Sequence, residues 1–264
     1  MITILVKAAD GTMIASAQSA DDARLCIDRV YEDGDTVEIL ADEKHLCVQM
    51  DVTLLPGEVY LPNGRMTWHV PAGEHRLAYA PGAFETKRHV ITARPMTAEE
   101  INGRRDIACN PADLRGKTDF FPHITANVET RNEACFCARN AINGLHCNNY
   151  HGEWPFGSWG IGAREDAWCR IDFGREVMVD AMALILRADF PHDAYWVSGH
   201  VVLSDGAEVA FDLQKTGERQ IILLGKHTVR WMRLERMQKS DDPSAFPALT
   251  EWEVYGLSLI HISE

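Results

Sequence analysis

The sequence lacks the features that mark several large classes of protein. No apolar run approaches the roughly 18 residues that span a bilayer. The alternating start, Met1–Lys7, has neither the apolar core nor the cleavage site of a signal peptide. Positive charge is scarce, because 26 Lys and Arg face 39 Asp and Glu, and the net charge is -13. We therefore expect a cytoplasmic protein with neither a membrane nor a nucleic-acid partner.

Motifs of the common catalytic and metal centres are also missing. The chain has no Gly-rich phosphate loop, no nucleophile elbow and no His-Glu-x-x-His sequence. Seven cysteines cannot all pair, and several lie in apolar segments, so we expect buried free thiols in a reducing compartment. Cys135, Cys137, Cys147 and His151 lack the paired spacing of zinc knuckles, and we predict no metal centre.

Short alternating segments separated by turn residues fill most of residues 1–95, which we predict to be a small β-rich domain. The expected strands are 1–8, 36–40, 45–55, 58–61, 65–70 and 75–80. One helix is expected among them. Ser19 and Asp22 form a capping pair, and apolar residues recur at helical spacing up to Tyr31.

A connection over residues 96–120 follows this first domain. Thr97 and Glu100 form a second capping box there, which predicts a short helix to about Arg105. Strand patterns resume over residues 121–257, which we predict to be a second domain whose last strand ends at Tyr255-Gly256. The remaining residues, 258–264, resemble a translated sequencing adapter from an assembled environmental read, and we expect them to be a non-native tail.

Six segments of the second half resemble, in order, the motifs of galactose-binding-like or discoidin domains. They are 138–144 (A-x-D/N-G), 167–175 (W-x-x-I/V-D-L-G), 177–181, 201–206 (S-x-D-G), 229–234 (V-R-Y-I-R-L) and 249–256 (L-x-E-x-E-V-Y-G). The resemblance implies an all-β-dominated protein, with a C-terminal jelly-roll β-sandwich after the smaller β-rich domain. Many members hold a structural Ca²⁺ near the first of these segments, 138–144, which we call the early loop. Asn143 stands where Asp is common, so we predict no cofactor.

Aromatic and charged residues gather in the loops that the resemblance places at the ligand-binding end. A sugar ring stacks its C–H face on Trp, and its hydroxyls need paired donors and acceptors. We therefore interpret these residues as a saccharide-binding site. They are Tyr150, His151, Trp154 and Trp159 in the loop 146–160, Arg187, Asp189, His192 and Trp196 after the apolar strand 182–186, and Arg164 in a nearby turn.

Two other functions stay open beside carbohydrate binding. The first is a hydrolase or lyase acting on glycans or glycosides, with His151, Glu153, Asp189 and His192 as candidate acid and base groups. The second is a protein-interaction module or homo-oligomer in which the loop aromatics anchor an interface. A third interpretation gives these aromatics no ligand and packs them against the core. The sequence leaves open whether the protein is an enzyme.

Overall fold

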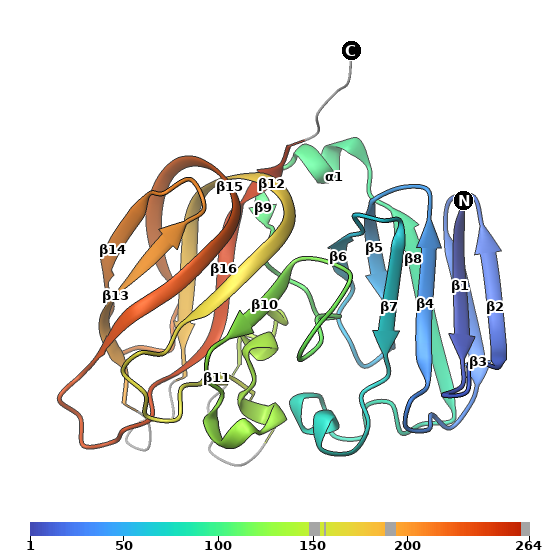
Figure 1. The fold of residues 1–264 in the computed structure, drawn as a ribbon, viewed down its shortest axis with the longest axis horizontal. Coiled ribbons are helices and arrows are strands. Elements are labelled where there is room, and N and C mark those ends of the chain that lie inside the picture. The colour runs from blue at the N-terminus through green and yellow to red at the C-terminus, as the bar shows by residue number, and fades with distance from the viewer. Residues whose placement is uncertain (148–153, 156, 188–193, 260–264) are drawn as a thin grey trace.

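A computed structural model describes residues 1–147, 154–155, 157–187 and 194–259. The described residues form an all-β protein of antiparallel strands, which confirms the fold class (Figure 1). The first eight strands are β1 (Ile2–Lys7), β2 (Met13–Ser19), β3 (Ala23–Asp28), β4 (Thr36–Ala41), β5 (His45–Gln49), β6 (Gly57–Tyr60), β7 (Arg65–His69) and β8 (Arg88–Pro95). The other eight are β9 (Arg105–Asp106), β10 (His123–Ala126), β11 (Trp159–Gly160), β12 (Cys169–Leu186), β13 (Trp196–Leu203), β14 (Glu208–Asp212), β15 (Gln220–Lys239) and β16 (Ala248–Ser258).

The N-terminal sandwich consists of two four-stranded sheets, ordered β2-β1-β4-β7 and β3-β8-β5-β6. Alternation places one side of each strand in a shared core. In β1, for example, Ile2, Ile4 and Val6 are all 0–1% exposed. Trp68 of β7 lies in the same core and donates from Nε1 to the carbonyl oxygen of Ala112, 3.0 Å away.

The predicted helix between Ser19 and Tyr31 is wrong, because this segment contains strand β3. The predicted capping hydrogen bond is present, because the Asp22 amide donates to Ser19 Oγ at 3.2 Å. It stabilises a turn before β3 rather than the start of a helix. After the turn, Ala23, Leu25 and Ile27 are buried and alternate with exposed residues, and the strand pairs with β8. Apolar residues at 23, 25 and 27 suit a period of two, and the tertiary pairing decides the outcome.

Two predicted strands also differ from the structure. Residues 75–80 overlap a 3₁₀ helix, η1 (Gly73–Ala78), and strand β5 ends at Gln49 rather than at residue 55. Three more 3₁₀ helices follow later in the described residues: η2 (Thr130–Asn132), η3 (Ala134–Phe136) and η4 (Ala138–Ile142). No helix among the described residues is long and apolar enough to cross a membrane.

The connection is packed against both sandwiches. Helix α1 (Ala98–Asn102) has the predicted capping box of Thr97 and Glu100, and it stops at Gly103, short of the expected end. Strand β9 then pairs with β16, and the next residues divide between two cores. Ile107 and Ala108 belong to the C-terminal core, whereas Ala112, Leu114 and Phe120 belong to the N-terminal core.

The C-terminal sandwich is built on two long strands, β12 and β15, within an eight-stranded antiparallel arrangement of the described residues. Strand β12 has a register shift between Asp172 and Val177, where Gly174 adopts a positive φ. Its first part pairs with β10 and its second part with β16, so the strands enclose one core. Strand β16 runs through Ser258, two residues beyond the expected end, and Arg175 donates to Ser258 Oγ.

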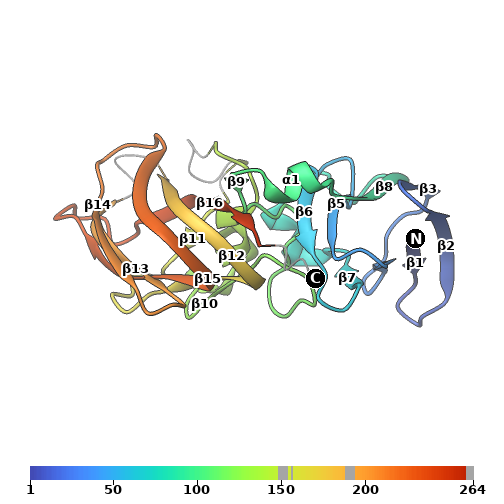
Figure 2. The ribbon, with the colours of Figure 1, turned by 90° about the horizontal axis from the view of Figure 1, so that it is seen from above.

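The two sandwiches lie side by side along the long axis of the molecule, with α1 and β9 between them (Figures 1 and 2). Tyr60 of β6 exchanges backbone hydrogen bonds with Phe121. The Arg175 guanidinium lies 4.9 Å from the centre of the Tyr60 ring. Glu58 of β6 pairs with Arg105 of β9, so charged and aromatic groups join the two halves.

Candidate functional site

Three of the residues predicted to bind a ligand lie inside the C-terminal sandwich. Trp159 and Trp196 are 0% and 1% exposed, and their ring centres are 6.2 Å apart. Trp159 also donates from Nε1 to the Val128 carbonyl at 2.9 Å. Arg187 is buried, with its guanidinium 5.8 Å from the Phe136 ring centre. All three side chains are thus buried, and Trp159 and Trp196 belong to the C-terminal hydrophobic core.

Two other predicted residues are at the surface. Arg164 is exposed in the turn before β12 and pairs with Asp166, with 2.8 Å between Nε and Oδ1. Trp154 keeps 37% of its surface exposed. The other predicted residues lie outside the described residues. They are Tyr150, His151, Asp189 and His192 of the binding site and Glu153 of the catalytic alternative.

Trp154 lines a small groove between the two sandwiches. The groove has a volume of about 150 Å³ and a mostly apolar lining. On the N-terminal side, Leu54 and the half-exposed Leu55 follow strand β5; on the C-terminal side, Leu145 follows the early loop. The lining also includes the polar residues Thr53, Arg139 and Asn143. The Thr53 hydroxyl donates to Asp51 Oδ1 at 2.7 Å, and Asn143 Oδ1 accepts from the Leu145 amide at 2.8 Å. An exposed indole beside such a groove is suited to a flat ligand with an apolar face and a polar edge.

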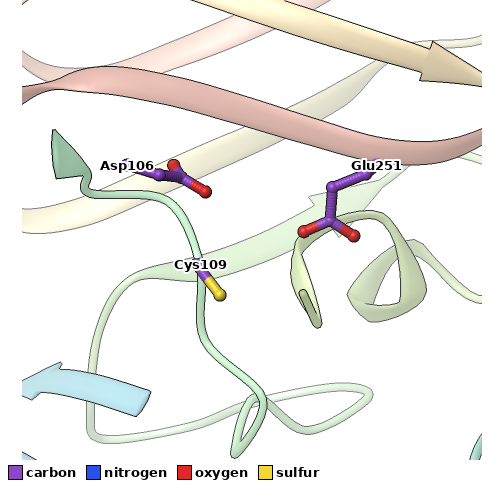
Figure 3. Close-up of side chains that lie close together, drawn as sticks. All are labelled: Asp106, Cys109 and Glu251. Carbon is purple, nitrogen blue, oxygen red and sulfur yellow. The ribbon is translucent and has the colours of Figure 1, made fainter. Parts of the chain in front are cut away.

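A second cluster, which we call the acid–thiol cluster, consists of Asp106, Cys109 and Glu251 (Figure 3). One oxygen of each carboxylate and the Cys109 sulfur all lie within 4.8 Å of one another. Asp106 ends β9, Cys109 follows three residues later, and Glu251 comes from β16. Asp106 Oδ1 accepts hydrogen bonds from the amides of Ala108 at 3.0 Å and Val254 at 2.9 Å, which fixes the turn between β9 and Cys109.

Glu251 is fully buried. Its Oε1 accepts a hydrogen bond from the Gly144 amide at 2.9 Å, and its Oε2 has no hydrogen-bond partner among the described residues. Burial raises the pKa of Asp106 to about 7, although the backbone amides of Val254 and Ala108 act in the opposite direction. Burial also raises the pKa values of Glu251 and Cys109 well above their ordinary ranges. The cluster therefore favours neutral groups or a bound cation.

Glu253, two residues along β16, has the opposite environment. Burial raises its pKa, but hydrogen bonds from Arg219 and Tyr255 outweigh this effect, and the net pKa is lowered. Arg219 donates to both carboxylate oxygens, at 2.6 and 2.7 Å, and Tyr255 donates to Oε2 at 2.7 Å. His146 Nε2 lies 3.4 Å from Oε1. Strand β16 thus carries Glu253, which pairs with an arginine, two residues from Glu251, whose Oε2 has no hydrogen-bond partner among the described residues.

Sequence reasoning missed these residues, although one signal was present. In the closing segment 249–256, a period of two places Trp252 and Val254 on the core side and Glu251 and Glu253 on the other side. Two glutamates on the covered side of a strand indicate a polar cluster. The partners Asp106 and Cys109 lie far away in the sequence, in the connection, where no local pattern identifies them.

The residues do not fit the calcium ion that the family resemblance implies. Ca²⁺ takes six to eight oxygen ligands. Here Asn143 Oδ1 accepts a hydrogen bond from the Leu145 amide at 2.8 Å, and Glu251 Oε1 accepts one from Gly144. The third neighbour of the two carboxylates is a thiol, which Ca²⁺ does not favour.

No family model matches the chain, and no curated protein matches it. Solved structures similar to it include chitosan-binding module 1 of a chitosanase/glucanase from Paenibacillus sp. IK-5, with 19% identity, a TM-score of 0.41, and coverage of 58% of this chain and 99% of that chain. A family 32 CBM from C. perfringens NanJ, in complex with galactose, has 14% identity, a TM-score of 0.39, and coverage of 50% and 91%. A fucose-binding module from Streptococcus pneumoniae has 17% identity, a TM-score of 0.41, and coverage of 57% and 97%.

Proposed function

We propose that the protein binds a saccharide in the groove beside Trp154. The observation that carries the proposal is the exposed indole of Trp154 at an apolar groove whose lining also includes the polar residues Thr53 and Asn143. The C–H face of a pyranose packs on an indole, and ring hydroxyls need hydrogen-bonding groups at the edge. The groove holds about 150 Å³, less than the roughly 300–1,000 Å³ of typical small-molecule pockets, so we expect it to hold at most one sugar unit.

A polar surface on the same loop extends this site. Leu145 lines the groove, and the next residue, His146, lies beside Arg219 and Glu253. The side chains of His146 and Arg219 are 44% and 43% exposed. Glu253 fixes the guanidinium of Arg219, whose exposed part then offers donors to sugar hydroxyls or to an acidic substituent.

We also infer that the protein acts in the cytoplasm and that its two sandwiches are separate domains, 1–95 and 121–257. All seven cysteines are free thiols, as expected in a reducing compartment. Each sandwich has its own hydrophobic cluster, and residues 96–120 contribute to both. Ala134 and Cys137, from the second unit, pack in the N-terminal cluster.

A glycan array tests the saccharide proposal directly. The wild-type protein should be retained on a subset of immobilised saccharides, and Trp154→Ala should lose this retention. Trp231→Ala is the matched control, because Trp231 is a partly exposed tryptophan of β15 that stacks on Arg170 away from the groove. Mass spectrometry of the bound glycans gives the second measurement. Retention without product supports a binding module, product formation supports the glycan-active enzyme, and absence of retention on every glycan contradicts the proposal.

A further inference from the structure

We propose that the acid–thiol cluster binds one Zn²⁺ ion through Asp106, Cys109 and Glu251. None of these three side chains lines the saccharide groove, and the ligand set differs from the oxygen-only calcium site that the family resemblance implies. The site joins the connection to the closing strand, because Asp106 and Cys109 come from the first and Glu251 from the second.

The geometry requires only small movements. Zinc bonds are about 2.3 Å to sulfur and about 2.0–2.2 Å to a carboxylate oxygen, so ligand atoms in a tetrahedral site are roughly 3.3–3.8 Å apart. The three ligand atoms already lie within 4.8 Å of one another. Side-chain rotations that close this gap by about 1 Å complete the first three positions, and a water molecule takes the fourth.

The state of Glu251 points to a ligand independently of the clustering. Its side chain is 0% exposed, and Oε2 has no hydrogen-bond partner among the described residues. Arg219, the cation on the same side of β16, donates to both oxygens of Glu253 instead. A buried carboxylate oxygen without a partner is costly, and a divalent cation satisfies it together with the Asp106 carboxylate.

The Cys109 thiol indicates which metal ion the cluster would bind. Cys109 places sulfur beside two carboxylates, and a thiolate ligand favours zinc over calcium or magnesium. The backbone makes room for this sulfur. Gly144 has a φ of +76°, and a Cβ atom there would lie 3.1 Å from Cys109 Sγ. A glycine at this position lets the early loop pass close to the thiol while its amide binds Glu251.

The test uses the full chain, stripped of metal with EDTA and then titrated with Zn²⁺ or Co²⁺. We expect one equivalent of either metal to remain after dialysis. The cobalt protein should show a thiolate-to-metal charge-transfer band in the near ultraviolet. Cys109→Ser should abolish this band, and Cys135→Ser, which removes a buried thiol elsewhere, should keep it. Glu251→Gln should weaken zinc binding by more than the roughly 10–100-fold typical of losing an outer-shell partner.

Three outcomes would overturn the proposal. They are wild-type protein that retains no zinc or cobalt, a cobalt spectrum without a thiolate band, and a band that persists in Cys109→Ser. A rise in melting temperature with Ca²⁺ but not with Zn²⁺ would instead support the calcium site of the resemblance. If a substituted chain fails to fold, the wild-type cobalt spectrum still decides, because a missing thiolate band alone refutes ligation by Cys109.

Discussion

Replacing Trp154 by alanine should weaken saccharide binding without unfolding the protein. The indole is 37% exposed, so much of its surface is available to a ligand while the rest covers the groove lined by Leu54 and Leu145. Alanine removes the flat surface and leaves the backbone of the loop in place. The side chains of Thr53 and Asn143 should keep their positions, so the variant measures the contribution of stacking to saccharide binding separately from that of hydrogen bonds.

The size of the loss follows from the exposed area. A tryptophan side chain can bury up to about 250 Å². The exposed 37% then amounts to roughly 60–90 Å² that a sugar face can cover. At about 25 cal/mol per Å², this area contributes about 1.5–2.3 kcal/mol. Since about 1.4 kcal/mol is a factor of ten in Kd, Trp154→Ala should raise Kd roughly 10–50-fold.

Isothermal titration calorimetry measures this change, with the glycan that the array retains best. Trp154→Phe should recover part of the affinity, because a phenyl ring keeps a smaller stacking face. Trp231→Ala should leave Kd within about twofold of the wild-type value, since each factor of two is only about 0.4 kcal/mol. A Trp154→Ala variant that folds and binds with unchanged Kd would refute the role assigned to this indole, as would an equal loss in Trp231→Ala.

Three further predictions concern stability, each measured as a shift in urea midpoint. Burial lowers the pKa of His123, but the charge and hydrogen bond of Asp113 outweigh this effect, and the net pKa is raised. The free energy of unfolding should therefore fall as pH rises through the folded-state pKa of His123. His123→Asn should make this pH dependence weaker. A steeper fall in the variant would contradict this assignment. Gly256→Ala should cost about 1–3 kcal/mol or more, because the new Cβ atom would lie 2.1 Å from the Met178 carbonyl oxygen; a neutral effect would show that β12 and β16 separate freely. Trp68→Phe should cost about 1–3 kcal/mol from the buried carbonyl it leaves unpaired, and a smaller loss would mean that water replaces the indole donor.

The sequence predicts the local patterns better than the long-range contacts. Alternation identifies β1, and the Thr97 capping box identifies α1, because both signals lie within a few neighbouring residues. The segment after Ser19 is ambiguous, since apolar residues at 23, 25 and 27 fit a strand and the cap fits a helix. Its pairing with β8, whose paired residues lie 60 to 70 positions further along the sequence, decides between them. The local sequence pattern therefore cannot predict whether this segment is a helix or a strand.

The same limit explains the candidate site. Trp154 and Trp159 lie in the same aromatic segment, 146–160, and the sequence around them does not distinguish them. Only the packing of the whole sandwich shows that Trp159 is buried while Trp154 is exposed. The sequence does identify aromatic residues that a ligand could use. It does not show which of these aromatic residues are buried in the hydrophobic core.

The early loop connects the groove to the acid–thiol cluster. Asn143 and Leu145 line the groove beside Trp154, and between them the Gly144 amide donates to Glu251. The position of this loop therefore depends on the same carboxylate that faces Asp106 and Cys109. The adjacent connection enters both hydrophobic cores through Ala108 and Ala112. The hydrogen bond between Gly144 and Glu251 therefore fixes the loop that forms one wall of the groove at the junction of the two sandwiches.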